Sequence, residues 1–177
     1  MHGIRTAAHA ARFVLRFFQF RPARAAWRLE LGRDVTVEGH VRLPGPGRVR
    51  IGDGVRLVGR RSPVELRAHE GAEIIIESGA LLEDGCSVEA TRSVRIGSRA
   101  RIGSFCKIID NHFHRAAGDR RMRPEANPVR IGVGALVGPH AVILPGAAMA
   151  DGSVLGAATA LSFHLPAGTH FPGARPA

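Results

Sequence analysis

The chain has 177 residues, of which 45% are hydrophobic and 23% are charged, with 22 Gly and 11 Pro. That length suits one domain with its own hydrophobic core. The formal net charge of +10 favours anionic partners. Nucleic acid is disfavoured among them, because aromatic residues make up only 5% of the chain and no zinc-finger, RNA-recognition or basic-zipper motif is present.

Residues 1–32 form a basic block with no acidic residue before Glu30. Its apolar positions and its arginines four residues apart, such as Arg12 and Arg16, predict a basic amphipathic helix that Pro22 should break or kink. The arginines leave no apolar stretch of the ~20 residues that a membrane span requires. We expect this helix either to cap the open end of the following domain, which we favour, or to contact an anionic membrane surface peripherally.

After residue 33 the sequence repeats with a period of six. Aliphatic residues recur at every sixth position, and a mostly small residue follows four positions after each. The pattern occurs in three blocks, with a two-residue slip between the first and the second. These aliphatic positions are Ile76, Leu82 and Val88, then Ile96, Ile102 and Ile108, then Ile131, Val137, Ile143, Met149, Leu155 and Leu161.

A period of six fits neither the 3.6-residue turn of a helix nor the plain alternation of a long strand. It predicts a coil of short strands, in which each aliphatic side chain stacks on its equivalent one coil away, at the ~4.8 Å spacing of adjacent strands. Cys86 and Cys106 lie in the small-residue positions, so we expect them to be core residues. Two cysteines are too few for a disulfide framework, which favours a reducing cytoplasm.

One insertion, at 109–128, breaks the repeat in the second half of the chain. A long polar insertion in a regular coil is typical of a functional loop. It contains His112 and His114, preceded by Asp110. An imidazole titrates near about pH 6.5 and can take a proton from an attacking hydroxyl. The spacing does not choose between the two histidines, and Asp110 either orients such a base, binds a ligand hydroxyl or satisfies a turn.

On these repeats, on the letters DNHFH at 110–114 and on the ending GARPA at 173–177, the chain resembles the left-handed parallel β-helix acyltransferases with hexapeptide repeats. It is most similar to the sugar O-acetyltransferases of the maltose, nodulation and exopolysaccharide-biosynthesis type. The resemblance implies an all-β domain over 33–177 with three hexapeptides per triangular coil. It also implies a homotrimer whose active sites lie between subunits.

The resemblance further implies transfer of an acetyl group from acetyl-CoA to a hydroxyl of a sugar or glycan precursor, by direct attack in a ternary complex and without a metal. It makes His114 the general base. His112 and Asp110 are then further catalytic candidates, and Asn111 and Arg115 are substrate-binding candidates. By motif position, coenzyme A is expected to contact Gly138, Ala157, Ser162 and Arg175.

Two alternatives remain open. The first is a non-catalytic β-helix scaffold or binding protein, because Leu136 replaces a Trp and Phe163-His164 replaces a Lys-Asp pair that many members of the family carry. The second is a metal-dependent hydratase similar to the γ-class carbonic anhydrases, which needs three histidines from adjacent coils. His112 and His114 are too close in the sequence to supply that spacing, so we rank the hydratase below the scaffold.

Overall fold

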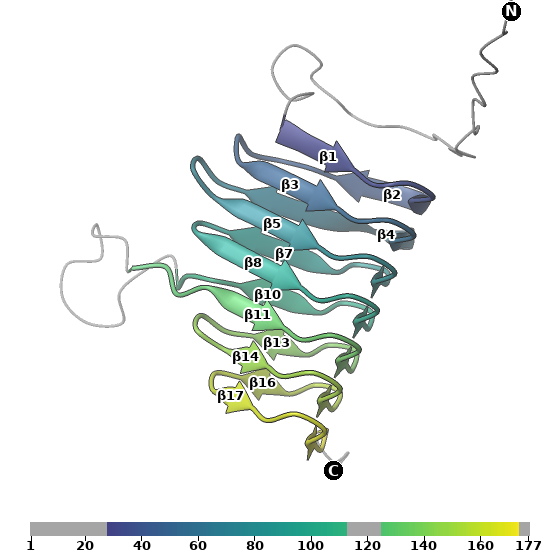
Figure 1. The fold of residues 1–177 in the computed structure, drawn as a ribbon. Helices are drawn as coiled ribbons and strands as arrows, with labels where there is room; N and C mark the ends of the chain where they lie inside the picture. Colours follow the sequence, from purple (N-terminus) through teal and green to yellow (C-terminus); the bar gives the residue numbers. More distant parts are fainter. Residues whose placement is uncertain (1–27, 113–124, 174–177) are drawn as a thin grey trace, which may run out of the picture.

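The computed structural model describes residues 28–112 and 125–173, and every structural statement below refers to these residues. They form an all-β parallel solenoid of about seven turns (Figure 1). Of the segment 1–32, for which a helix is predicted, the structure describes only residues 28–32. His114, Arg115 and Arg175 also lie outside the described residues. In the part of the chain that is described, no helix has the length and hydropathy of a membrane-spanning segment.

Face one of the solenoid is a seven-stranded parallel sheet, which Figure 1 shows running from one end of the molecule to the other. Its first strand lies within residues 1–32, so the solenoid begins before the expected boundary at 33. The strands, in spatial order, are β1 (Leu29–Leu31), β3 (Arg48–Ile51), β5 (Glu73–Ile76), β8 (Ser93–Ile96), β11 (Val129–Ile131), β14 (Ala148–Met149) and β17 (His164–Leu165).

The other two faces meet at β4 (Arg56–Ala68), a long strand whose start pairs with β6 and whose end pairs with β7. Face two continues from β4 through β6 (Leu81–Leu82), β9 (Arg101–Ile102), β12 (Leu136–Val137), β15 (Val154–Leu155) and β18 (His170–Phe171). Face three continues from β4 through β7 (Ser87–Ala90), β10 (Lys107–Ile109), β13 (Val142–Ile143) and β16 (Ala160–Leu161). β2 (Thr36–Arg42) pairs with β4. The cross-section is therefore three-sided.

The hexapeptide aliphatics fill the interior, as the sequence predicts. Ile131 pairs with Met149 and Val137 pairs with Leu155, so equivalent positions in these coils are eighteen residues apart, which is three hexapeptides. These side chains are all buried. Burial of each side chain stabilises the fold by about 2 kcal/mol relative to an exposed position. In the parallel coils each aliphatic side chain stacks on an aliphatic side chain of the next coil. The repeat is thus confirmed as the source of the core.

The two-residue slip marks a longer coil. Ile76 pairs with Ile96, so this coil contains twenty residues, and the strands on either side of its last corner, β7 and β8, are each four residues long. Cys86 and Cys106 are buried, as predicted, and each sulfur donates to a glycine carbonyl oxygen of the next coil at 3.1 Å. A hydrogen bond with Cys106 and burial raise the pKa of Cys86, which keeps that thiol protonated.

Candidate functional site

The insertion leaves the solenoid at the corner between face three and face one. β10 ends at Ile109 and β11 begins at Val129. The backbone closes the neck of the insertion, because the Asn127 N–H donates to the Asp110 carbonyl oxygen at 2.8 Å. The Asn127 carbonyl oxygen accepts in turn from the Gly146 N–H at 3.0 Å, which ties the neck to the next coil. Backbone hydrogen bonds therefore hold the two ends of the insertion together and to the solenoid.

Asp110 is a fully buried carboxylate at this neck. One oxygen accepts from the Thr91 N–H at 2.8 Å and from its hydroxyl at 2.9 Å, and the other accepts from the N–H groups of Arg92 at 2.7 Å and Ser93 at 2.8 Å. Four donors use nearly all the lone pairs of a carboxylate. Among the roles open to Asp110, these contacts favour the one that satisfies a turn, namely the corner between β7 and β8.

Asn111 and His112 follow Asp110 into the insertion. Asn111 is 4% exposed, and its side-chain amide donates to an Asp110 carboxylate oxygen at 3.2 Å. His112 is exposed to solvent. The sequence therefore places an imidazole directly after two anchored residues. That arrangement limits the motion of the backbone from which His112 projects, which is what a positioned proton acceptor requires.

Gly138 and Ala157, two of the predicted coenzyme contacts, lie in successive coils at the corner between face two and face three. The Gly138 N–H donates to the Leu155 carbonyl oxygen at 2.7 Å, and a Cβ at Gly138 would lie 2.5 Å from the Ala157 nitrogen. Only glycine fits this approach. Ser162 is exposed just after β16, at the opposite edge of face three. The structure thus brings Gly138 and Ala157 together and leaves Ser162 apart from them.

The insertion and the Gly138 corner belong to different edges of the prism. The neck at Asp110 and Asn127 lies between faces three and one, whereas Gly138 lies between faces two and three. Within the described residues of one chain, Ser162 shares the edge of the neck, whereas Gly138 and Ala157 lie on a different edge from the predicted base region.

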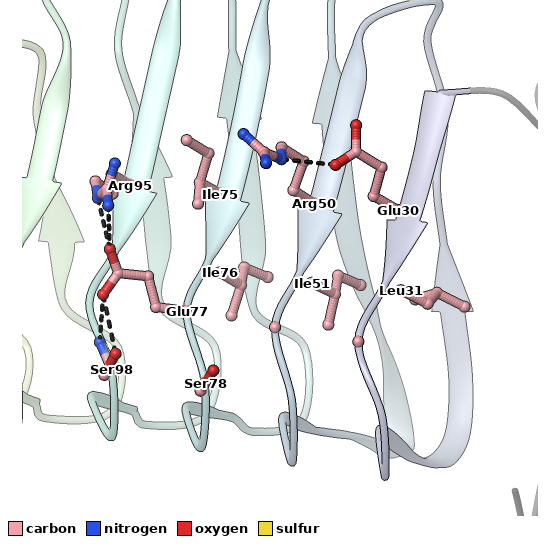
Figure 2. A pocket seen from close by; sticks show the side chains of 12 residues that line it. Glu30, Leu31, Arg50, Ile51, Ile75, Ile76, Glu77, Ser78, Arg95 and Ser98 are labelled. Atoms are coloured by element: carbon pink, nitrogen blue, oxygen red, sulfur yellow. Dashed lines mark hydrogen bonds and ion pairs between the residues drawn. The ribbon is translucent and has the colours of Figure 1, made fainter.

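A groove on face one is lined by charged and apolar residues of the N-terminal coils (Figure 2). Its charges are paired with one another, since Arg50 donates to Glu30 at 2.8 Å and Arg95 donates to Glu77 at 2.7 Å. Burial raises the pKa of Glu77, but hydrogen bonds from Ser98 and Arg95 outweigh it and hold that pKa below its ordinary value. The groove contains none of the predicted site residues.

Sequence reasoning missed one charged cluster at the edge of face three. His69 Nε2 lies 2.7 Å from a carboxylate oxygen of Glu89, on the coil next to the one that carries the insertion. The sequence did contain a signal for this cluster, because the polar residues Glu65, Arg67 and His69 occupy every second position at the end of β4 and just after it, and so share one face of the strand. The contact with Glu89 could not be predicted, because the coils are of irregular length and the register between β4 and β7 is known only from the structure.

Within residues 28–112 and 125–173, no three His, Cys, Asp or Glu side chains gather into a group that could hold a metal ion. His114 lies outside these ranges.

No family model matches the chain. The bifunctional protein GlmU of Oleidesulfovibrio alaskensis is 30% identical over 86 residues, which are 49% of this chain and 18% of that protein. The chain therefore spans less than a fifth of the length of the curated relative it matches.

Among solved structures, the GDP-perosamine N-acetyl transferase of Caulobacter crescentus, in complex with CoA and GDP-perosamine, is 19% identical with a TM-score of 0.33, covering 78% of this chain and 50% of that one. The polySia-specific acetyltransferase NeuO is 14% identical with a TM-score of 0.41, covering 82% of each chain. Superpositions this loose carry no argument about the site.

Proposed function

We propose that the protein is an acyltransferase of the hexapeptide-repeat family, with a left-handed coil, that moves an acetyl group from acetyl-CoA to a hydroxyl of a sugar or glycan precursor. One observation carries the proposal. A regular hexapeptide solenoid is interrupted at a fixed corner, and a histidine-bearing segment begins there directly after two buried, hydrogen-bonded residues, Asp110 and Asn111. The family resemblance of the sequence supplies the chemistry.

In this mechanism the acceptor hydroxyl oxygen attacks the thioester carbonyl carbon while an imidazole takes the hydroxyl proton. His114 is the proposed base, and His112 either orients it or faces the acceptor. The tetrahedral intermediate collapses with cleavage of the C–S bond, and the proton passes from the imidazolium to the departing thiolate. A backbone N–H stabilises the oxyanion. Neither thiol is needed as a nucleophile, which agrees with the burial of both.

The site is proposed to form between subunits of a homotrimer. In a single chain the neck of the insertion and the Gly138 corner lie on different edges of the prism. A neighbouring copy can bring its Gly138 corner against the insertion of the first, because cyclic packing of a three-sided prism apposes edges of adjacent subunits. Arg115 and Asn111 would then contact the acceptor.

Coenzyme A is proposed to run along the C-terminal coils. Gly138 packs tightly on the Ala157 backbone of the next coil, and Ala157 is exposed there with only a methyl side chain, so little stands between a pantetheine arm and this corner. Ser162 and Arg175 complete the proposed contacts, with Arg175 suited to the phosphate oxygens.

Transfer of radiolabelled acetyl from acetyl-CoA to a panel of sugars tests the proposal. We expect His114→Ala to lower turnover by a factor of about 10²–10⁴ while the oligomeric state stays unchanged. The matched control is His40→Ala, an exposed histidine on β2 in the N-terminal coils, which should leave turnover unchanged. A protein that neither binds nor hydrolyses acetyl-CoA would instead be the scaffold. If His112→Ala abolishes turnover and His114→Ala does not, the base is His112.

A further inference from the structure

Four charged side chains form a cluster on the outer surface of face three, which we call the His69 cluster: Glu65, Arg67 and His69 from β4 and the corner after it, and Glu89 from β7. Arg67 Nη2 donates to Glu65 Oε1 at 3.1 Å. His69 Nε2 lies 2.7 Å from Glu89 Oε1, and Arg67 Nε lies 3.8 Å from the same oxygen. Two carboxylates, one guanidinium and one imidazole are thus in contact.

The two carboxylates of the cluster have acceptor capacity that their neighbours do not use. An ionised carboxylate only accepts, so His69 Nε2 donates to Glu89 Oε1. Glu65 Oε2 and Glu89 Oε2 have no hydrogen bond to any residue that the structure describes. Two carboxylate oxygens are therefore available to a ligand that brings donors.

The side chains of the cluster are half-buried and stay accessible. Glu89 is 16% exposed and His69 is 33% exposed, which is lower than the surface arginines on face one. Their mutual contacts limit rotamer freedom, so less entropy is lost when a ligand binds. A held, partly desolvated set of charged groups is suited to recognition of a polar ligand.

The position of the cluster links it to the insertion. Glu89 pairs in register with Ile109, the residue before Asp110, so it lies one strand away, at ~4.8 Å, from the neck. The Asp110 carboxylate in turn binds the Thr91 backbone and hydroxyl, two residues after Glu89. A ligand seated on the cluster would therefore lie beside the start of the histidine-bearing segment.

We infer that the His69 cluster is a subsite for a hydroxyl-rich sugar ring of the acceptor. Neighbouring hydroxyls of such a ring donate to the free carboxylate oxygens of Glu89 and Glu65, and the remaining Arg67 N–H groups donate to a ring or hydroxyl oxygen. The two carboxylates repel acidic sugars, so the ring held here is uncharged. The inference rests on the proposed function for the acetyl transfer that follows, but the binding itself can be observed separately.

The test compares Glu89→Gln and His69→Ala with Glu73→Gln. Glu73 is a matched control because it is a partly exposed carboxylate that faces an arginine, Arg50 at 3.7 Å, but it lies on face one. With acetyl-CoA saturating, Glu89→Gln and His69→Ala should raise the KM for the acceptor at least tenfold. The kcat and the KM for acetyl-CoA should stay within twofold, and Glu73→Gln should leave all three unchanged.

The same three variants and the parent protein are applied to a glycan array that carries neutral, amino and acidic sugars. We expect the parent to bind neutral glycans and the two cluster variants to lose that binding. If this occurs while no acetyl transfer is found with any acceptor, the subsite stands and the proposed function fails.

An unchanged acceptor KM overturns the subsite, as does retention of glycan binding by Glu89→Gln. Preference of the parent for acidic or amino sugars overturns the ring chemistry proposed here. A fall in kcat without a change in acceptor KM assigns the cluster to chemistry and also overturns the inference. Glu89→Asp keeps the charge and should bind better than Glu89→Gln, whereas equal losses with lowered thermal stability would indicate a purely structural role.

Discussion

The coils before the insertion and those after it share a core but differ on their surfaces. All the ion pairs found within the described residues lie between positions 30 and 95. Residues 129–173 contain one carboxylate, Asp151, and their outward positions are mostly small or apolar. The N-terminal coils pair many of their charges with one another, whereas the C-terminal coils expose backbone and small side chains.

The comparison indicates that the same interior repeat can support two different kinds of surface. Stacked coils gain the same apolar burial in both regions, because equivalent interior positions are aliphatic throughout. Surface charge is therefore free to vary. Exposed ion pairs contribute little stability each, so their absence after residue 129 costs the fold little, and it is on this surface that we propose coenzyme A and a neighbouring subunit to bind.

The boundary between the two regions depends on Asp110, and its loss should have the largest effect on stability. Asp110→Ala removes the acceptor for three backbone N–H groups and one hydroxyl. We expect the free energy of unfolding to fall by about 4 kcal/mol, because buried donors would be left unsatisfied. Urea unfolding followed by circular dichroism measures this change.

Asp151→Ala is the control from the C-terminal coils. Asp151 is exposed, and its carboxylate accepts from the Val133 N–H at 2.8 Å. Its loss should cost less than about 1.5 kcal/mol, the ordinary value for one such bond. Equal losses in the two variants would contradict the structural role assigned to Asp110.

The hexapeptide period was sufficient to predict the interior, because a core of stacked coils repeats in the sequence with the same spacing as in space. Ile131, Leu155 and Cys106 all lie where that period places them. The saturation of Asp110 was not predictable, since its partners lie at the end of a coil of twenty residues, which departs from the eighteen of three hexapeptides. The His69–Glu89 contact was missed for the same reason: it depends on register between coils of unequal length.

The start of the solenoid was also misplaced by the sequence pattern. β1 at Leu29–Leu31 pairs with β3, which places it on face one, although the sequence pattern predicts that the solenoid begins at 33. The placement of the predicted base, His114, stays a prediction because it lies outside the described residues.

The second-largest effect should be a difference between the two regions in stability at low pH. Hydrogen bonds from the Arg61 backbone lower the pKa of Asp84, a hydrogen bond from Arg56 lowers that of Glu38, and that of Glu77 is also lowered. A carboxyl whose pKa is lower in the folded chain contributes stability above its unfolded pKa of 3.8 or 4.5, and that stability is lost as the pH falls through the folded value.

Hydrogen exchange measured by mass spectrometry between pH 5 and about pH 2.5 checks this expectation, after correction for the intrinsic rate. Peptides from residues 30–95 should lose protection as the pH falls, because the coils of a solenoid are stabilised mainly by their neighbours. Peptides from 129–173 should keep theirs longer, since Asp151 is their one carboxylate. Simultaneous loss in both regions would indicate a single cooperative unit and contradict the comparison.

The smallest effect should come from breaking one surface pair of face one. Arg50 donates to Glu30 at 2.8 Å, but both side chains are about half exposed, so water and salt screen the pair. A double-mutant cycle of Arg50→Ala and Glu30→Ala should give a coupling of less than about 1 kcal/mol that decreases in 1 M NaCl. A coupling several times larger would mean that the N-terminal coils depend on their charges for stability, and the absence of ion pairs after residue 129 would then carry a real stability cost. Thermal unfolding of the four proteins at low and high salt distinguishes the two outcomes.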